Sequence, residues 1–553
     1  PYTDYDKANG IEKASAELCG FAKTDILAPG ASETVNITVD KSELRTYDAN
    51  NAKTYIVDAG DYYFTAATDA HNAVNNILAA KGYTVENTDG RMTADGNVAL
   101  TYKWTNAALD STTFATSENG TAITNLFDEA DPNKSSSEPG EVTWLSRSNW
   151  VATFPTQPVV LNATQTLADH LAFTRYDGSK ADSVEMPTLG ADNGLALVSM
   201  IGADYDDPQW DTLLDQLTFN EMVNTITLGF HNTAAIESIG KTRTKDENGP
   251  QGLTAALTGG ASAMCYTSED VMAATFNVDL IHDVGRCIGE DCLAMGYSGL
   301  YGPGINMHRT AYSGRNFEYY ASDPFVAGTI CAAEVNGIQS KGVYVYLKHV
   351  ALNDSESSRR GVNTWLNEQA AREIYLEVAN KAITDGGAWS VMSGFNRWGA
   401  YWCGAYDNLL TGFLRGELGM RGMIITDYSG SSKYMDLADG LIAGSDIWDS
   451  PDPTIHTTLA PKYENDAYIV TEMRESMHKI LYTVANSNAM NGWSSADRLK
   501  VITPWWKTAL YALDTVLAVL TVLCIWRLVV AIKRKKTWTA EQAANTANAQ
   551  NQQ

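Results

Sequence analysis

The strongest constraint in this sequence is a repeated alternation of short apolar runs and helical patterns between residues 209 and 490. The runs GVYVYLKHV, GAWSVMSGFN and RGMIITDYSG end near residues 348, 393 and 427, at intervals of about 35 to 45 residues. A helical pattern, NEQAAREIYLEVANKAI, occupies residues 367–383 between two of them. Alternation at this spacing is typical of a parallel sheet. About 280 residues are enough for a closed (β/α)8 barrel of the TIM type, so we predict an α/β fold of that kind.

Polar side chains stand where these apolar runs end. In a parallel barrel the carboxyl ends of the strands meet on one face, and active sites form there. The spacing therefore places a carboxylate, two cations, a histidine, a serine and amides on one face: Asp427, Lys348, Arg315, His349, Ser393, Asn396 and Asn248. Such a set offers the donors and acceptors that a polyhydroxyl ligand needs, and the neighbouring cations would keep the carboxylate ionised.

Each of these residues also has a simpler interpretation. An aspartate at a strand end is more often a helix N-cap or a loop hydrogen-bonder than a catalytic group. The Lys348-His349 pair fits a surface, and Arg315 with Glu318 fits a structural ion pair. From composition and spacing alone, the sequence predicts a barrel enzyme that acts on a polar small molecule.

Charge and motif content argue against several classes of function. The chain carries 40 basic and 66 acidic residues, and its net charge of -26 would repel a phosphate backbone, so we expect no nucleic acid partner. The sequence contains no HExxH, no GxGxxG after a strand and no P-loop, and its seven cysteines include no CxxC pair. We therefore expect no metal site and no cofactor.

The regions before the predicted barrel differ from it in composition and residue pattern. Residues 1–105 contain alternating segments such as ASETVNITVD and KTYIVDAGDYYFTAAT, punctuated by turn residues, and they predict a small β-sandwich. Residues 106–208 are rich in Ser, Thr, Asn, Asp and Gly, and we interpret them as an irregular connecting segment. The predicted barrel then occupies residues 209–495.

The C-terminal region predicts a membrane anchor. The mostly apolar residues from Thr508 to Ile532, about 25 of them, are enough to cross a bilayer, and we assign a transmembrane helix to residues 505–532. KRKK follows at once, so the positive-inside rule puts the tail, residues 533–553, in the cytoplasm and the preceding domains outside the cell. The low-complexity end of this tail is expected to be disordered. The expected location is the cell membrane, with a single pass.

Ordered motifs in the predicted barrel resemble glycoside hydrolase family 3, the family of β-glucosidases and β-xylosidases. They are LDQLTFNEMV, NGPQGL, GLYGPGINMHRTAYSGRNFEYYASDPFVAG, KHVALNDSESSRRG, VMSGFNRWGAYWCGAYDNLLTGFLRGELGMRGMIITDYSG and LIAGSDIW. Residues 1–105 resemble the fibronectin type III-like module of the same family, which usually follows the barrel and here precedes it, as in permuted members. The resemblance implies a hydrolase whose substrate is a β-glycoside or an oligosaccharide.

The resemblance also assigns roles to single residues. Asp427 matches the family's catalytic nucleophile, which forms a covalent glycosyl-enzyme and retains the configuration at the anomeric carbon. Three residues match those that bind the hydroxyls of the non-reducing-end sugar: Arg315, Lys348 and His349. Three further positions depart from the family pattern, where aspartate, tyrosine and tryptophan are usual: Asn248, Phe395 and Tyr428.

A retaining glycosidase needs a second carboxyl group about 5 Å from the nucleophile. In the glucosidase branch this acid/base is a glutamate of an α/β sandwich domain, which in a permuted chain would precede Pro1. We expect this chain to be a piece of a longer protein or a processed one. Glu356, on the loop after Lys348 and His349, is interpreted as a structural or binding residue. The alternative class is a catalytically weak, surface-anchored receptor that binds glycans, and the sugar, the aglycone and the oligomeric state are left open.

Overall fold

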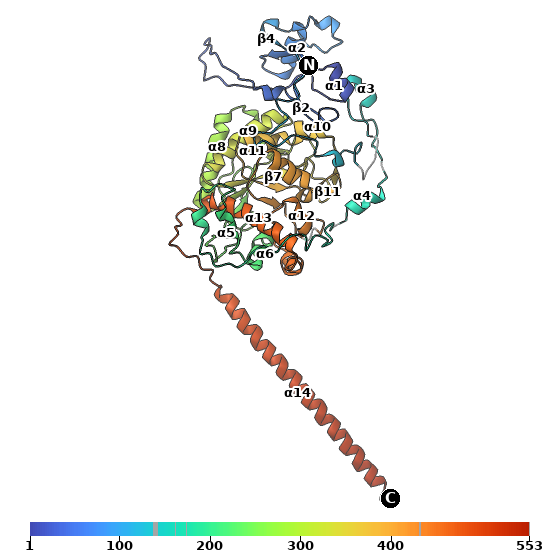
Figure 1. Cartoon of the computed structure of the whole chain (residues 1–553), viewed down its shortest axis with the longest axis vertical. Helices are drawn as coiled ribbons and strands as arrows, with labels where there is room; N and C mark the ends of the chain where they lie inside the picture. Colours follow the sequence, from blue (N-terminus) through green and yellow to red (C-terminus); the bar gives the residue numbers. More distant parts are fainter. Residues whose placement is uncertain (136–141, 161, 173, 431–432, 552–553) are drawn as a thin grey trace. The chain divides into compact units, whose positions relative to one another are not determined.

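The structure is a computed structural model of the chain. It describes residues 1–135, 142–160, 162–172, 174–430 and 433–551. The chain divides into two compact units, Pro1–Asp497 and Arg498–Gln553 (Figure 1). The first unit contains the sheets and the hydrophobic core, and the second contains the long C-terminal helix.

A five-stranded parallel sheet forms the centre of the first unit, with the strand order β12-β9-β7-β6-β5. Its strands are β5 (Asp246–Asn248), β6 (Gly299–Tyr301), β7 (Tyr344–Val350), β9 (Ser390–Ser393) and β12 (Ile424–Thr426). Strands β7, β9 and β12 are buried along their whole length, because the three apolar runs of the sequence form them and a doubly covered strand has no polar face. The structure thus confirms the predicted α/β class.

Backbone hydrogen bonds continue the sheet beyond its two edge strands. Ile447 forms a parallel bridge with Ile425 of β12, and the backbone N–H of Trp448 donates to the carbonyl of Ile226. The segment after Ile226 returns to the other edge, where the carbonyl of His231 accepts a hydrogen bond from the first residue of β5. In the described part of the chain the sheet therefore has five assigned strands rather than the eight predicted, and short hydrogen-bonded segments connect its edges.

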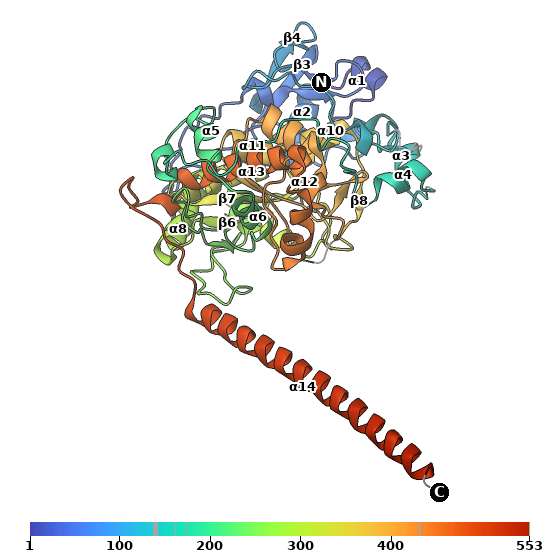
Figure 2. The ribbon, with the colours of Figure 1, turned by 60° about the horizontal axis from the view of Figure 1, so that its bottom comes forward.

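Helices surround the sheet, and both Figure 1 and Figure 2 show α11, α12 and α13 gathered around the position of β7. The larger helices of this layer are α5 (Gln209–Leu214), α6 (Phe219–Thr227), α7 (Glu269–Ala274), α8 (Val278–Met295), α9 (Pro324–Gln339), α11 (Glu377–Thr384), α12 (Leu437–Ala443) and α13 (Ala467–Ala485). The helix predicted over residues 367–383 is present as α10 (Glu368–Ala370), a π-helical turn at Ala371–Tyr375, and α11.

The N-terminal region contains two pairs of antiparallel strands. They are β1 (Thr46–Asp48) with β2 (Thr54–Ile56), and β3 (Gly60–Thr65) with β4 (Thr101–Asn106), with α2 (Ala70–Ala80) between the last two strands. The strands predicted over KTYIVDAGDYYFTAAT are thereby confirmed. The strand predicted over residues 31–40 is wrong, because no strand is assigned there and Val35 and Ile37 are 39% and 46% exposed. An alternating pattern needs a partner strand for its backbone groups, and none pairs with this segment among the described residues.

The segment 106–208 packs onto the sheet region through a few buried groups. Phe127 is fully buried and stacks on Trp398, with the ring centroids 4.2 Å apart. The backbone N–H of Phe127 donates to the carboxylate of Glu368, which also pairs with the buried guanidinium of Arg372. The segment's α-helices are short: α3 (Trp150–Thr153) and α4 (Gln165–His170).

The second unit is dominated by α14 (Trp505–Gln550), a helix of 46 residues. Its most apolar 18-residue window has a mean hydropathy of 2.5, and by length and composition the helix can cross a membrane. The apolar helix expected over residues 505–532 is therefore present. It also continues to Gln550, through the tail that was expected to be disordered; this tail is rich in alanine and glutamine, which favour a helix.

Candidate active site

Asp427 directly follows β12, where the chain leaves the parallel sheet. Its backbone N–H donates to the carbonyl of Ser393 on β9, and its Oδ1 accepts the backbone N–H of Tyr428 at 2.7 Å. Its Oδ2 is buried and has no hydrogen-bond partner among the residues that the structure describes. Buried polar atoms in folded proteins are nearly always paired, and an unpaired one costs about 1–3 kcal/mol. Other buried atoms of the described residues are unpaired as well, and Oδ2 is distinguished by its place just after the carboxyl end of β12, where active sites of parallel α/β folds form, so it is a candidate reacting atom.

Two nitrogen-bearing side chains face this unpaired oxygen. His349 Nε2 lies 3.6 Å from Asp427 Oδ2, and a terminal nitrogen of Arg359 lies 3.7 Å from it. Burial raises the pKa of Asp427 above its usual value, while Arg359 and the following backbone N–H oppose this rise. Arg315 and Lys348 add to the opposition. The cations therefore act to lower the pKa of Asp427, as predicted, but burial raises this pKa by more than they lower it.

His349 is buried, and its imidazole is uncharged at neutral pH. Burial lowers the pKa of His349 well below its usual value, and Arg315, Lys348 and Arg359 lower it further. Its Nε2 lies 3.2 Å from the guanidinium of Arg315, and its Nδ1 lies 3.4 Å from the hydroxyl of Tyr319. A neutral imidazole in this place can exchange a hydrogen bond with a ligand hydroxyl, but it adds no charge next to the carboxylate.

Arg315 and Lys348 share the carboxylate of Glu318. Arg315 Nε pairs with one carboxylate oxygen, and Lys348 Nζ lies 3.9 Å from the other. Burial lowers the pKa of Lys348, whereas Glu318 acts to raise it. The structure thus brings four of the predicted residues into one cluster: Asp427, Arg315, Lys348 and His349.

Phe395 and Tyr428 lie beside this cluster and differ in exposure. The ring of buried Phe395 lies 4.7 Å from the guanidinium carbon of Arg359, a cation–π contact. Tyr428 is 38% exposed, and its ring meets that of Phe230 edge-on at 6.0 Å. These aromatic side chains provide apolar surface next to the charged groups.

Strand ends and backbone contacts hold the three other polar residues of the predicted site, Asn248, Ser393 and Asn396. Asn248 ends β5 with its amide 3.5 Å from Glu247. Ser393 ends β9, and the amide of Asn396 donates to the carbonyl of Ala351, which ties together the loops after β7 and β9. Among the described residues, no side-chain hydrogen bond joins any of the three to the carboxylate at the end of β12.

Arg359 is a residue of the cluster that the sequence analysis did not single out. Besides its contact with Asp427, its Nε lies 3.0 Å from Glu356, so one guanidinium group joins two carboxylates. The signal that could have found it is its position in SESSRRG, on the loop that follows Lys348 and His349 of β7.

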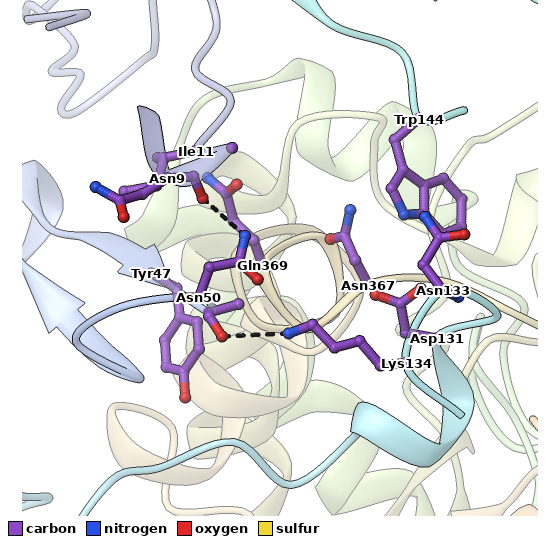
Figure 3. A pocket seen from close by; sticks show the side chains of 12 residues that line it. Asn9, Ile11, Tyr47, Asn50, Asp131, Asn133, Lys134, Trp144, Asn367 and Gln369 are labelled. Atoms are coloured by element: carbon purple, nitrogen blue, oxygen red, sulfur yellow. Dashed lines mark hydrogen bonds between the residues drawn. The ribbon is translucent and has the colours of Figure 1, made fainter. Parts of the chain in front are cut away.

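A separate cavity of about 150 Å³ contains none of the predicted site residues (Figure 3). Polar side chains and one indole line most of it: Asn9, Asn50, Asp131, Asn133, Lys134, Trp144, Asn367 and Gln369. The ammonium group of Lys134 donates to the carbonyl of Ala49 at its wall, at 3.2 Å. The chemistry of the cluster around Asp427 therefore does not depend on this cavity.

Comparison with protein families gives two matches. Residues 231–455 match the family model described as Glycosyl hydrolase family 3 N terminal domain, and residues 2–70 match the one described as Fibronectin type III-like domain. The first match contains all five strands of the parallel sheet and the cluster around Asp427, and the second contains β1, β2 and β3.

Individual proteins that resemble the chain are described as β-glucosidases. A β-glucosidase of Rhizobium radiobacter is 34% identical over 240 residues, which cover 43% of this chain and 29% of that protein. β-Glucosidase A of Butyrivibrio fibrisolvens is 27% identical over 456 residues, 79% of this chain and 49% of that protein. A solved β-glucosidase from Paenibacillus barengoltzii shares the fold, with a TM-score of 0.64 and 20% identity over 89% of this chain and 52% of that one.

The parallel α/β domain with the buried carboxylate after β12 lies within the first match, and part of the region before it lies within the second. The match places residues 231–455 in glycoside hydrolase family 3. The chain spans 29% and 49% of the length of the two curated relatives described above.

Proposed function

We propose that the protein is a retaining glycoside hydrolase that releases β-linked glucose, or a related sugar, from the non-reducing end of oligosaccharides or glycosides. The observation that carries this proposal is the buried, unpaired Oδ2 of Asp427, faced by Arg359 and His349. The relatives described as β-glucosidases support the substrate class. No metal or cofactor takes part in the proposed reaction.

Asp427 is the proposed nucleophile. Its carboxylate attacks the anomeric carbon and forms a covalent glycosyl-enzyme, which water later hydrolyses with net retention of configuration. The hydrogen bond from the Tyr428 N–H holds Oδ1, so Oδ2 is the oxygen left to react. Burial keeps water away from this oxygen, and Arg359 stabilises its ionised form.

The charged groups around the nucleophile are proposed to bind the sugar hydroxyls. Arg315, Lys348 and Arg359 supply hydrogen-bond donors in fixed positions, because carboxylates already orient them. His349 can exchange its contact with Arg315 for one with a sugar hydroxyl, and Phe395 offers an apolar wall. Hydroxyl-rich ligands need such a mixture of polar groups and apolar surface.

The setting of the site is part of the proposal. We take the five-stranded sheet to belong to a barrel, closed by the segments at Ile447–Trp448 and Ile226–His231. The domain limits at 1–105, 106–208 and 209–495 are retained as proposals. Helix α14 would anchor the chain in the cell membrane, with the site outside the cell and residues 533–553 in the cytoplasm.

Trapping of the covalent intermediate tests this function. The whole chain is incubated with 2,4-dinitrophenyl 2-deoxy-2-fluoro-β-glucoside, and its mass is measured before and after proteolysis. We expect one fluoroglucosyl group on the peptide that contains Asp427, and none on the Asp427→Asn variant. Asp452→Asn serves as the control, because this carboxylate only caps a turn at Thr454.

A glycan receptor without turnover is the second candidate function. The amide of Asn248 at the end of β5 favours it, since an amide is a weaker acceptor for a sugar hydroxyl than a carboxylate. Reversible binding of the fluoroglucoside without a covalent adduct would support the receptor and reject the hydrolase.

A further inference from the structure

Arg360 is an exposed cation beside the cluster around Asp427, and it has no carboxylate partner among the residues that the structure describes. Its guanidinium carbon lies 5.4 Å from the ring of Phe395, and that of Arg359 lies 4.7 Å from the same ring. Arg359 in turn lies 3.7 Å from Asp427 Oδ2. One aromatic side chain therefore separates Arg360 from the cation that contacts the proposed nucleophile.

The charges of the cluster balance without Arg360. Three cations and three carboxylates each lie at most 3.9 Å from a partner of opposite charge: Arg315, Lys348, Arg359, Glu318, Glu356 and Asp427. Arg360 adds a positive charge that these carboxylates do not offset. The whole chain has 66 acidic and 40 basic residues, so this local excess is opposite in sign to the composition. A local excess of positive charge attracts anions.

The exposure of the four cations rises in one direction. The side chains of Lys348, Arg315 and Arg359 are 6%, 19% and 29% exposed, and Arg360 is more exposed than these. In the proposed reaction the terminal sugar occupies the inner part of the site, and the leaving group extends from the anomeric carbon toward solvent. Arg360 therefore lies on the side of the leaving group.

Tyr434 links Arg360 to the nucleophile. The hydroxyl of Tyr434 donates to the carbonyl of Phe395 at 2.9 Å. Burial raises the pKa of Tyr434, Arg397 and Arg360 act to lower it, and the charge of Asp427 acts to raise it. One hydroxyl group is thus within electrostatic reach of both Arg360 and Asp427, so a ligand bonded at Asp427 can extend to Arg360.

The chemistry of an arginine in this position favours an anion. A guanidinium group offers several N–H donors in one plane, which match the oxygens of a carboxylate, a phosphate or a sulfate. Contact with the face of Phe395 restricts the orientation of this group before a ligand binds. A cationic leaving group would be repelled, and a neutral hydroxyl would gain a weaker hydrogen bond.

We propose that Arg360 binds an anionic group on the leaving part of the substrate, so that the site prefers β-glycosides whose aglycone carries a carboxylate, a phosphate or a sulfate. This inference rests on the proposed function as a hydrolase and names the substrate class of the same site. Arg360 does not contact the reacting atoms; its role is to determine specificity by binding.

An acidic sugar is the competing location for the anion. Its carboxylate would lie in the inner part of the site, near Lys348 and Arg315. Both of these cations already share the carboxylate of Glu318, which would repel a second one. The leaving group is therefore the better place for a negative charge.

Two substrates that differ in charge test this role. They are 3-carboxy-4-nitrophenyl β-glucoside and its neutral 3-carbamoyl analogue, assayed with the whole chain at pH 7. We expect kcat/KM to be about 3–10-fold higher for the carboxylate, through a lower KM, because this group lies away from the reacting carbon. The ratio should shrink as sodium chloride rises from about 50 to about 500 mM.

Substitutions of Arg360 should change this ratio in a defined order. Arg360→Met should lower it to about 1, and Arg360→Glu should lower it further, because a like charge repels the carboxylate. Arg421→Met is the matched control and should keep the wild-type ratio. Arg421 is also exposed and stacks on a ring, that of Tyr205 at 5.1 Å, but it precedes β12, at the end of the strand opposite Asp427.

The other outcomes reject the inference. A wild-type ratio near 1, or a ratio that Arg360→Met leaves unchanged, would show that Arg360 is a solvated surface residue. A preference for 4-nitrophenyl β-glucuronide over 4-nitrophenyl β-glucoside would place the anion on the sugar. If the fluoroglucosyl adduct forms without measurable turnover, the ratio is taken from the rates of adduct formation with the 2-deoxy-2-fluoro analogues of both substrates. Absence of both adduct and turnover would overturn the proposed function itself, and this inference with it.

Discussion

The guanidinium group of Arg359 lies 3.7 Å from Oδ2 of Asp427, the oxygen that is otherwise unpaired in the described structure. The same group lies 3.0 Å from Glu356 and 4.7 Å from the ring of Phe395. An ion pair and a cation–π contact thus fix one cation beside the proposed nucleophile. Because these contacts exist before any ligand binds, the cation needs little reorganisation during the reaction.

Arg359→Ala is expected to lower kcat/KM for an aryl β-glucoside by roughly 10–100-fold, the value of a hydrogen bond to a charged group. Arg359 lowers the pKa of Asp427, so without it the carboxylate takes up a proton at a higher pH. The acidic limb of the pH–rate profile should therefore move to higher pH. Arg360→Ala removes an exposed arginine 5.4 Å from the same ring and should leave the limb in place. An unmoved limb in Arg359→Ala would contradict the assignment.

Asp427→Asn is expected to stabilise the folded chain at neutral pH by about 1 kcal/mol or more, although it removes the proposed nucleophile. Burial raises the folded-state pKa of Asp427 above its unfolded value. Such a group favours folding below its unfolded pKa, and this contribution is lost as the pH rises through its folded pKa. The variant's gain in Tm should therefore be largest at neutral pH and vanish below about pH 4. Thermal unfolding at several pH values measures it, and a lower Tm of the variant at pH 7 would contradict the argument.

Arg372→Met is expected to destabilise the first unit by about 3–5 kcal/mol. Arg372 is fully buried and lies 2.7 Å from both Glu368 and Glu417, so its loss leaves two buried carboxylates without a cation. Urea unfolding measures the change. Arg286→Met, which breaks a surface pair with Asp283, should cost less than about 1 kcal/mol. Similar losses in the free energy of unfolding for the two variants would show that the buried ion pairs of Arg372 add no stability.

The central strands could be predicted because each combines an apolar run with a polar residue at its end. The runs that reach Lys348, Ser393 and Asp427 form β7, β9 and β12. A strand that is covered on both faces must be apolar along its length, and few other elements produce such short runs. The convergence of the polar ends then follows from the parallel direction of the strands.

The position of Asp449, whose backbone N–H donates to Thr426 Oγ1 just before Asp427, could not be predicted in the same way. Only Ile447 and Trp448 separate it from Asp446, which is too short an apolar run to signal a strand. Its position depends on backbone hydrogen bonds to the segment around Thr426, and these pair residues far apart in the sequence. A pattern read along one segment contains no information about such partners.

Two other differences have a similar cause. The contact of Arg359 with Asp427 depends on the course of a loop, which no periodicity encodes. Residues 31–40 alternate as a strand should, yet no described strand pairs with them, and the exposed segment stays irregular. Local pattern therefore identified buried strands, while contacts between segments required the structure.

Leu520→Arg is expected to reduce the membrane association of the whole chain, whereas Ala544→Arg should not. Leu520 lies in the middle of the apolar part of α14, where insertion of an arginine costs about 2.5–3.5 kcal/mol, and Ala544 lies in its polar C-terminal part. Carbonate extraction followed by flotation with phosphatidylcholine vesicles measures the bound fraction. This fraction should fall for Leu520→Arg and match wild type for Ala544→Arg, because only the first position would lie within the hydrocarbon core. Equal flotation of both variants would mean that α14 does not cross the bilayer.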